Sequence, residues 1–171
     1  MFPLFTSVDS LTQMQELLQE IVPQHLMSED MLVVFQQVAL SNLRGKVVVL
    51  AFGSSSIPLF SRELASLQRV AARYESRRVA VYWVSLDDDQ PGKRNYASNA
   101  QLQTFLQQSN LKIEVLRDPR MALFRSFNLE AVPTIVLLDQ SGRLVRRYVG
   151  IGTDQGEIHA ELIEEIERLI R

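Results

Sequence analysis

The stretch KVVVLAF, residues 46–52, constrains the fold more than any other part of this sequence. A short, continuous apolar run of this kind indicates a strand that is buried on both faces. A serine-rich turn follows it, and residues 58–75 then repeat apolar side chains with the period of an amphipathic helix. A buried strand followed by such a helix predicts a β-α-β arrangement around a central sheet.

Strand and helix patterns alternate along the rest of the chain. They predict helices at residues 10–22 and 58–75, after Ser98, after Asp118 and after Asp154, and strands at 31–40, 46–52, 78–86 and 113–116. The segments TIVLLD and RLVRRYVG flank Gly142 and predict a β-hairpin. We therefore expect an α/β fold with a central mixed β-sheet flanked by helices, a closing β-hairpin and an extra N-terminal helix.

Helix starts are marked by capping residues. Ser98 with Gln101 has the form of a capping box, and Asp154 with Glu157 has an equivalent spacing. Asp118 followed by Pro119 is typical of an N-cap residue and a first-turn proline. These signals predict where three of the helices begin.

The length favours one domain. A chain of 171 residues can bury a single sizeable core, and no linker or internal repeat divides it. We expect residues 1–171 to form one domain, with residues 1–30 as an N-terminal helical extension and residues 31–171 as the core.

Composition excludes several partners. A net charge of −2 provides no attraction to nucleic acid or to an anionic membrane, so neither is expected as a partner. No apolar run approaches the length of a membrane span, and the segment MFPLFTSVDS lacks the pattern of a signal peptide. If the chain is complete as given, a cytoplasmic protein is expected.

The chain contains no cysteine. A disulfide, a thiolate nucleophile and a cysteine metal ligand are therefore all excluded. The run of Asp87, Asp88 and Asp89 after a predicted strand is interpreted as part of a solvated loop, with a calcium site as the alternative. We expect no metal and no cofactor.

Two longer stretches resemble a known family. The segment LSNLRGKVVVLAFGSSSIPLFSREL, residues 40–64, is similar to the motif LxxLRGKVVVLNFWAxWCxxCRxExP of the TlpA/ResA family of bacterial thiol-disulfide oxidoreductases. The segment LRDPRMALFRSFNLEAVPTIVLLDQSGRLVRRYVG, residues 116–150, resembles the second half of the same family, whose V-P-T is its cis-proline element. The likeness covers about residues 38–155 and implies a thioredoxin-like fold and an extracytoplasmic setting.

The resemblance places the family's two cysteines at Ile57 and Phe60, neither of which carries sulfur. It places the polar strand residue at Ala51 and the tryptophan before the first cysteine at Ser56. It also makes Pro133 the cis-proline, beside the helix that follows the turn. The family's thiol-disulfide exchange therefore has no reacting group in this chain.

The serines do not replace those thiols. A hydroxyl cannot exchange with a disulfide, and as an acyl nucleophile it needs an adjacent base. The chain has no G-x-S-x-G turn, and its two histidines are His25 and His159. We interpret Ser56 as the N-cap of the following helix, with anion binding by the three serines and the helix N-terminus as the alternative.

Recognition can persist without sulfur. In the family, backbone groups of the residue before the cis-proline pair with an extended peptide, a role that falls here on Val132. We predict no catalytic residue and a site for a peptide or protein partner formed by Ser54, Ser55, Ser56, Ile57, Pro58, Leu59 and Phe60 with Val132, Pro133 and Thr134. Phe60 has core packing as its alternative role.

Three functions remain open. The first is a redox-inactive binding protein that uses these residues. The second is a thiol-disulfide oxidoreductase of the same family whose residues 57 and 60 have been altered, or whose activity depends on another chain. The third is an assembly role in which the helix at residues 10–22 packs against a partner. The sequence assigns neither the partner nor the oligomeric state.

Overall fold

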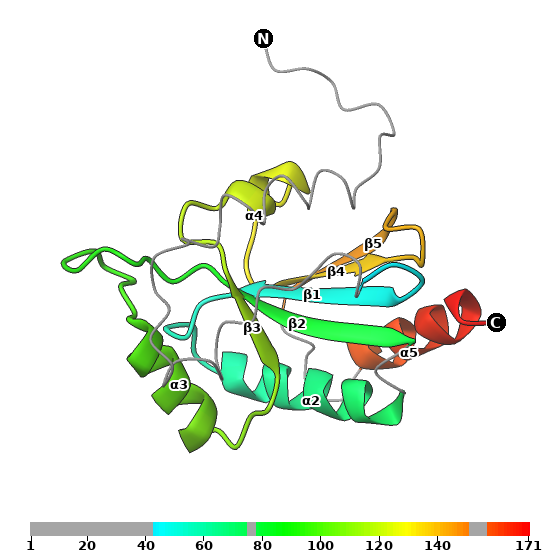
Figure 1. The fold of residues 1–171 in the computed structure, drawn as a ribbon, viewed down its shortest axis with the longest axis horizontal. Coiled ribbons are helices and arrows are strands. Elements are labelled where there is room, and N and C mark those ends of the chain that lie inside the picture. The colour runs from blue at the N-terminus through cyan, green and yellow to red at the C-terminus, as the bar shows by residue number, and fades with distance from the viewer. Residues whose placement is uncertain (1–42, 75–77, 151–156) are drawn as a thin grey trace, which may run out of the picture.

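The structure is a computed structural model that describes residues 43–74, 78–150 and 157–171. One mixed sheet has the strand order β3-β2-β1-β4-β5 (Figure 1). Its strands are β1 Val47–Gly53, β2 Val79–Ser85, β3 Glu114–Arg117, β4 Thr134–Leu138 and β5 Leu144–Val149. The helices are α2 Phe60–Arg73, α3 Asn99–Gln108, α4 Ala122–Ser126 and α5 Glu157–Leu169.

Strand β1 is the centre of the sheet. It is parallel to β2 on one side and antiparallel to β4 on the other, and all seven of its residues are buried. This confirms the prediction that the apolar run forms a strand covered on both faces. Strands β3 and β5 form the two edges, and β5 closes the antiparallel hairpin with β4.

Alternate residues of β1 point to two separate cores. Helices α2, α3 and α5 cover one face of the sheet, and α4 lies on the other (Figure 1). The first core is built on Val47, Val49 and Ala51 and includes Phe60, Leu64, Leu67, Leu102, Leu106, Leu162 and Ile166. The second is built on Val48, Leu50 and Phe52 and includes Leu123, Phe124 and Phe127.

The helix starts agree with the sequence in one place and differ in two. The capping box of α3 is confirmed, because Ser98 accepts from the Gln101 N–H and the Gln101 side chain accepts from the Ser98 N–H. The helix expected at residues 58–75 is shorter, since α2 begins at Phe60 and ends at Arg73.

The N-cap assignment of Asp118 is wrong by position. The N-cap of α4 is Met121, and the Asp118 carboxylate reaches forward to accept from the N–H groups of Ala122 and Phe124, at 2.7 and 2.9 Å. Asp118 is buried, and a buried carboxylate needs several donors, which the first turn of the helix supplies. The Asp118 side chain therefore caps α4, although Asp118 itself precedes the N-cap residue.

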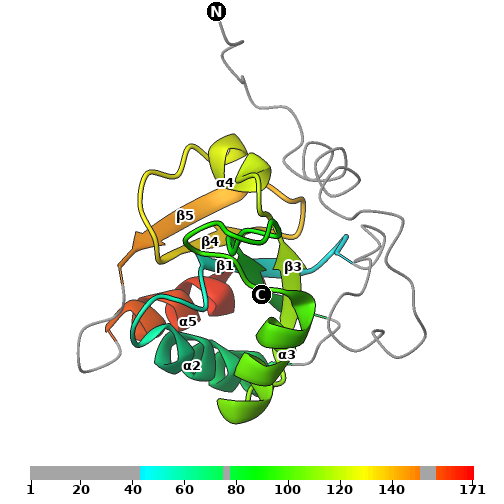
Figure 2. The ribbon, with the colours of Figure 1, turned by 90° about the vertical axis from the view of Figure 1, so that its left-hand side faces the viewer.

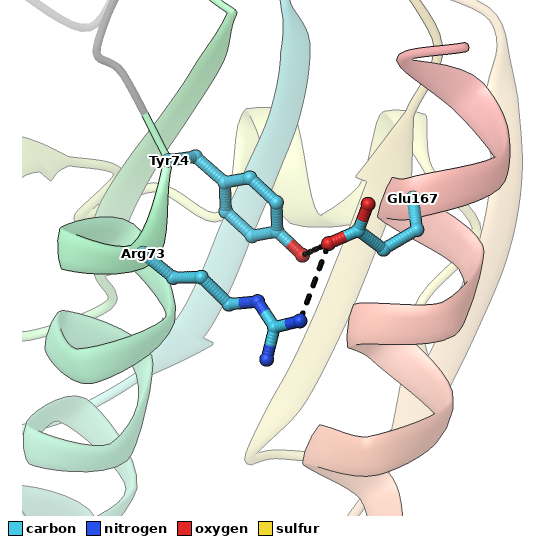
Figure 3. A network of polar contacts seen from close by, with 3 residues as sticks. All are labelled: Arg73, Tyr74 and Glu167. Atoms are coloured by element: carbon cyan, nitrogen blue, oxygen red, sulfur yellow. Dashed lines mark hydrogen bonds and ion pairs between the residues drawn. The ribbon is translucent and has the colours of Figure 1, made fainter.

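Helix α5 is tied to the end of α2 by polar contacts. The Tyr74 hydroxyl donates to Glu167 Oε1 at 3.2 Å, and the Arg73 guanidinium donates to the same oxygen at 3.4 Å (Figure 3). The predicted helix at residues 10–22, the predicted strand at 31–40 and the cap at Asp154 lie outside the described residues.

The pKa of Tyr82 can be used to test whether its side chain on β2 is buried. Burial raises its pKa from 10.0 to about 12, and the charge of Glu114 adds to the effect. The folded state then holds the phenolic proton more tightly than the unfolded chain does. The resulting stabilisation is complete below pH 10 and is lost as the pH rises from 10 towards 12.

The variant Tyr82→Phe should therefore lose less stability over that range than the wild-type protein does. Urea unfolding at a series of alkaline pH values measures the difference. Tyr74 and Tyr148 are present in both proteins, so their own raised pKa values cancel in the comparison. Equal losses in the two proteins would show that Tyr82 is not buried as described.

Candidate functional site

Four strands meet at the sheet end where the serine turn lies. Gly53 and Ser85 are partners at the ends of the parallel strands β1 and β2. Thr134, which begins β4, pairs with Phe52 on one side and with Val149, the last residue of β5, on the other. The turn after β1 and the loop before β4 therefore lie at one end of the sheet, which faces the viewer in Figure 2.

We call this end the serine-turn face and define it by residues 54–60 and 132–134. These are the ten predicted site residues. The pairing of Phe52 with Thr134 places the two predicted groups at the same end of the sheet. Val132 is exposed, whereas Pro133 and Thr134 are buried. The Val132-Pro133 peptide bond is cis, which is the form that the resemblance implies.

The serine turn is held by one buried carboxylate, that of Asp87. The hydroxyls of Ser54 and Ser55 donate to Asp87 Oδ1 at 2.7 and 2.8 Å. The Ser55 N–H donates to both carboxylate oxygens, and the Ser85 hydroxyl donates to Oδ2 at 2.7 Å. Asp87 is only 1% exposed, so these donors provide the partners that a buried carboxylate requires.

This arrangement corrects two expectations. Asp87 is not part of a solvated loop, because it lies directly beneath the turn. Ser56 is not the N-cap of α2, because the helix begins at Phe60 and the N-cap is Leu59, which has no side-chain cap. Since the Ser54 proton is committed to Asp87, the Ser56 hydroxyl donates to Ser54 Oγ, at 2.7 Å.

Sequence reasoning missed Asp87, although a signal for it exists. Parallel neighbouring strands end at the same edge, so the first polar residues after β2 must lie near the turn after β1. The N–H of Leu86, the residue before Asp87, donates to the Gly53 carbonyl at 3.0 Å and fixes that proximity. A serine run after one of these strands and an aspartate after the other therefore indicate that their side chains hydrogen-bond to one another.

Phe60 is a core residue, which settles its alternative role. Its side chain is fully buried and packs edge-on against Trp83, with 5.8 Å between the ring centroids. Its ring also lies directly over Gly53, where a Cβ atom would stand 2.4 Å from Phe60 Cζ. The Trp83 indole N–H donates to the Gly53 carbonyl at 3.0 Å, so the three residues form one packed unit.

The other residues of the turn face outwards. Ile57 is half-buried against the core that contains Phe60, and Pro58 is exposed. Leu59 is 54% exposed and has a φ of +65°, which places it in the left-handed region. Of the predicted binding residues that follow Ser56, Pro58 and Leu59 are therefore exposed, Ile57 is half-buried and Phe60 is buried.

A second buried polar contact lies behind the turn. Glu63 on α2 is almost fully buried, and its Oε1 lies 3.3 Å from Nε2 of His159 on α5. His159 therefore faces a carboxylate rather than a serine hydroxyl. This geometry does not supply the base that a serine nucleophile requires.

No group of three metal-ligating side chains comes together within the described ranges. The acidic run is dispersed, because Asp87 is enclosed by the serines and Asp88 accepts from the Gln90 N–H. Of the helices that the structure describes, none has the length and apolar character needed to cross a membrane.

Comparison with known proteins gives consistent results. The sequence profile of the AhpC/TSA family matches residues 11–147. The thiol-disulfide oxidoreductase ResA of Halalkalibacterium halodurans is 21% identical over 136 residues, which are 80% of this chain and 69% of that protein. ResA of Bacillus cereus is 22% identical over 120 residues, which are 70% of this chain and 64% of that protein.

Solved structures show the same fold. A thiol-disulfide isomerase from Corynebacterium glutamicum has a TM-score of 0.64 at 20% identity, covering 81% of this chain and 89% of its own. A putative thiol:disulfide interchange protein DsbE from Chlorobium tepidum has a TM-score of 0.62 at 24% identity, covering 74% of this chain and 84% of its own. These likenesses confirm the predicted thioredoxin-like fold.

The contact between Phe60 and Gly53 can be tested by a double-mutant cycle. Gly53→Ala should destabilise the wild-type protein, because the new methyl group collides with the Phe60 ring. In a Phe60→Ala background the same change should cost little, since the ring is absent. Urea unfolding of the four proteins should give a coupling energy of about 1 kcal/mol or more.

Phe60→Ala alone should lower the free energy of unfolding by roughly 3–5 kcal/mol. The matched control is Phe105→Ala, because Phe105 also packs against Trp83 but is only half-buried, so its truncation should cost less stability. A coupling energy near zero would show that Phe60 does not lie over Gly53.

Proposed function

Because this chain belongs to the AhpC/TSA family but contains no cysteine, we propose that it is a redox-inactive member that binds a partner protein through the serine-turn face. The partner contributes an extended segment. Exposed apolar side chains and unpaired backbone at this face are the observations that carry the proposal.

Redox inactivity follows from what occupies the reacting positions. Thiol-disulfide exchange needs a thiolate nucleophile, and no side chain of this protein can form one. The position that the motif assigns to the second cysteine holds Phe60, which is part of the core. The hydroxyls of Ser54 and Ser55 are already donated to Asp87.

Exposed apolar side chains support binding at this face. Within the described ranges, the large hydrophobic residues that are exposed are Leu59 at 54%, Val132 at 42% and Val149 at 63%. Leu59 ends the turn, Val132 precedes β4, and Val149 pairs with Thr134. All three therefore lie at the same end of the sheet, and an apolar patch of this kind is typical of an interaction site.

The backbone at Val132 supports an extended partner. Within the described residues, nothing hydrogen-bonds to the N–H or the carbonyl of Val132. The next carbonyl along, that of Pro133, is already used by the Gly150 N–H at 2.9 Å. An extended peptide that pairs with Val132 would hydrogen-bond to both of these groups by strand addition.

A second candidate is redox activity that depends on a thiol from another chain. The similarity to proteins named thiol-disulfide oxidoreductases favours it. The packing of Phe60 weighs against it, because a resolving thiol at that position would have to displace a fully buried ring.

Binding can be tested with a display library of short random peptides selected on the immobilised protein. Selected peptides should shift the amide resonances of Val132 and of its neighbours in the turn. Val132→Asp should weaken their binding by about tenfold or more, since it places a charge in the apolar patch. A peptide N-methylated at the paired residue should also bind weakly, because strand addition needs its N–H.

The matched control is Ala72→Asp, an exposed change at the opposite end of α2 that should leave binding unchanged. Shifts centred on the β3 edge, or equal binding by the N-methylated peptide, would contradict the proposal.

A further inference from the structure

Leu59 combines three features that each oppose folding. Its φ of +65° is a conformation that side chains with a Cβ adopt at a cost of roughly five- to thirtyfold in an equilibrium constant. It is a large apolar residue that is 54% exposed. It also occupies the N-cap position of α2 without a side-chain acceptor for the free N–H groups there.

The other left-handed residues within the described ranges have evident reasons for their conformation. Asn110 and Asn128 belong to the residue type that tolerates it best. Met121 packs its side chain against the core below α4. Leu59 is neither an asparagine nor packed against a core through its side chain, so the fold alone does not account for leucine at this position.

The conformation is imposed from both sides of the residue. After Leu59, the Phe60 ring is seated over Gly53, which fixes where α2 begins. The Leu59 carbonyl accepts from the N–H groups of Arg62 and Glu63, at 2.9 and 3.3 Å. Before it, the Asp87 contacts hold the turn, and the Ile57 carbonyl accepts from the Phe60 N–H. With its backbone held in this way, Leu59 presents its side chain to solvent.

We propose that Leu59 is the specificity-determining residue of the serine-turn face and selects a large apolar side chain in an extended partner peptide. This inference rests on the proposed function. The exposed residues of this face are Ser56, Pro58, Leu59 and Val132, none of which carries a charge, so the face matches an uncharged segment. The N–H and carbonyl of Val132, which have no hydrogen-bond partner among the described residues, match an extended one.

Peptide selection on a charge variant tests the specificity directly. Peptides selected from a random display library on the wild type should share a large apolar residue at one position. Selection on Leu59→Lys should replace that residue with aspartate or glutamate, because the contact now carries a positive charge. An unchanged preference would overturn the assignment of Leu59.

A second variant separates binding from folding. Leu59→Asn places a residue at 59 that tolerates the left-handed conformation and can cap the helix. Its urea unfolding midpoint should be equal to or above that of the wild type, whereas its affinity for the selected peptides should fall by about tenfold or more. Leu59→Met, which keeps an apolar side chain, should retain most of the affinity.

A lower unfolding midpoint in Leu59→Asn would show that Leu59 is structural and would overturn the inference. If selected peptides shift the Val132 amide but bind Leu59→Asn as tightly as the wild type, the inference fails and the proposed function stands. If no selected peptide shifts the Val132 amide, the proposed function fails and the inference fails with it.

Discussion

The seating of the Phe60 ring over Gly53 and against Trp83 is the contact on which the rest of this protein depends. The family motif has tryptophan at the position of Gly53 and cysteine at the position of Phe60, so a large residue and a small one have exchanged places. The Phe60 ring fills the space that a side chain on residue 53 would need, so glycine at 53 and phenylalanine at 60 fit together in the core. A buried aromatic ring, rather than a thiol, therefore occupies the position that the motif assigns to the second cysteine.

The same contact shapes the surface. Because Phe60 points inwards, α2 begins there, and the preceding residues form a turn that is secured from below by Asp87. The Asp87 oxygens accept from the hydroxyls of Ser54, Ser55 and Ser85 and from the Ser55 N–H, which gives this buried group the partners that it requires. The turn can then hold an exposed leucine in an unfavourable conformation. The serine-turn face therefore combines a buried polar anchor with exposed apolar side chains.

The buried central strand and the capping box of α3 were predictable because their signals are local. The run at 46–52 has no polar residue to place outside, and the Ser98 capping box depends on residues three positions apart. The start of α2 and the role of Asp87 were not predicted, because both depend on contacts between distant parts of the chain. Ser56, two residues before Pro58, has the form of an N-cap, but Asp87 accepts from Ser54 and Ser55, and the Ser56 hydroxyl bonds to Ser54 instead of to the helix.

The central claim is most directly tested by the NMR resonances of the Gly53 α-protons. A ring seated where a Cβ would stand must shield the α-proton that points towards it, so one Gly53 α-proton should be displaced strongly upfield and show nuclear Overhauser contacts to the Phe60 ring. Two ordinary, nearly equivalent Gly53 α-proton shifts without such contacts would contradict the account. They would mean that Phe60 is not part of the core and that the turn is not held as described.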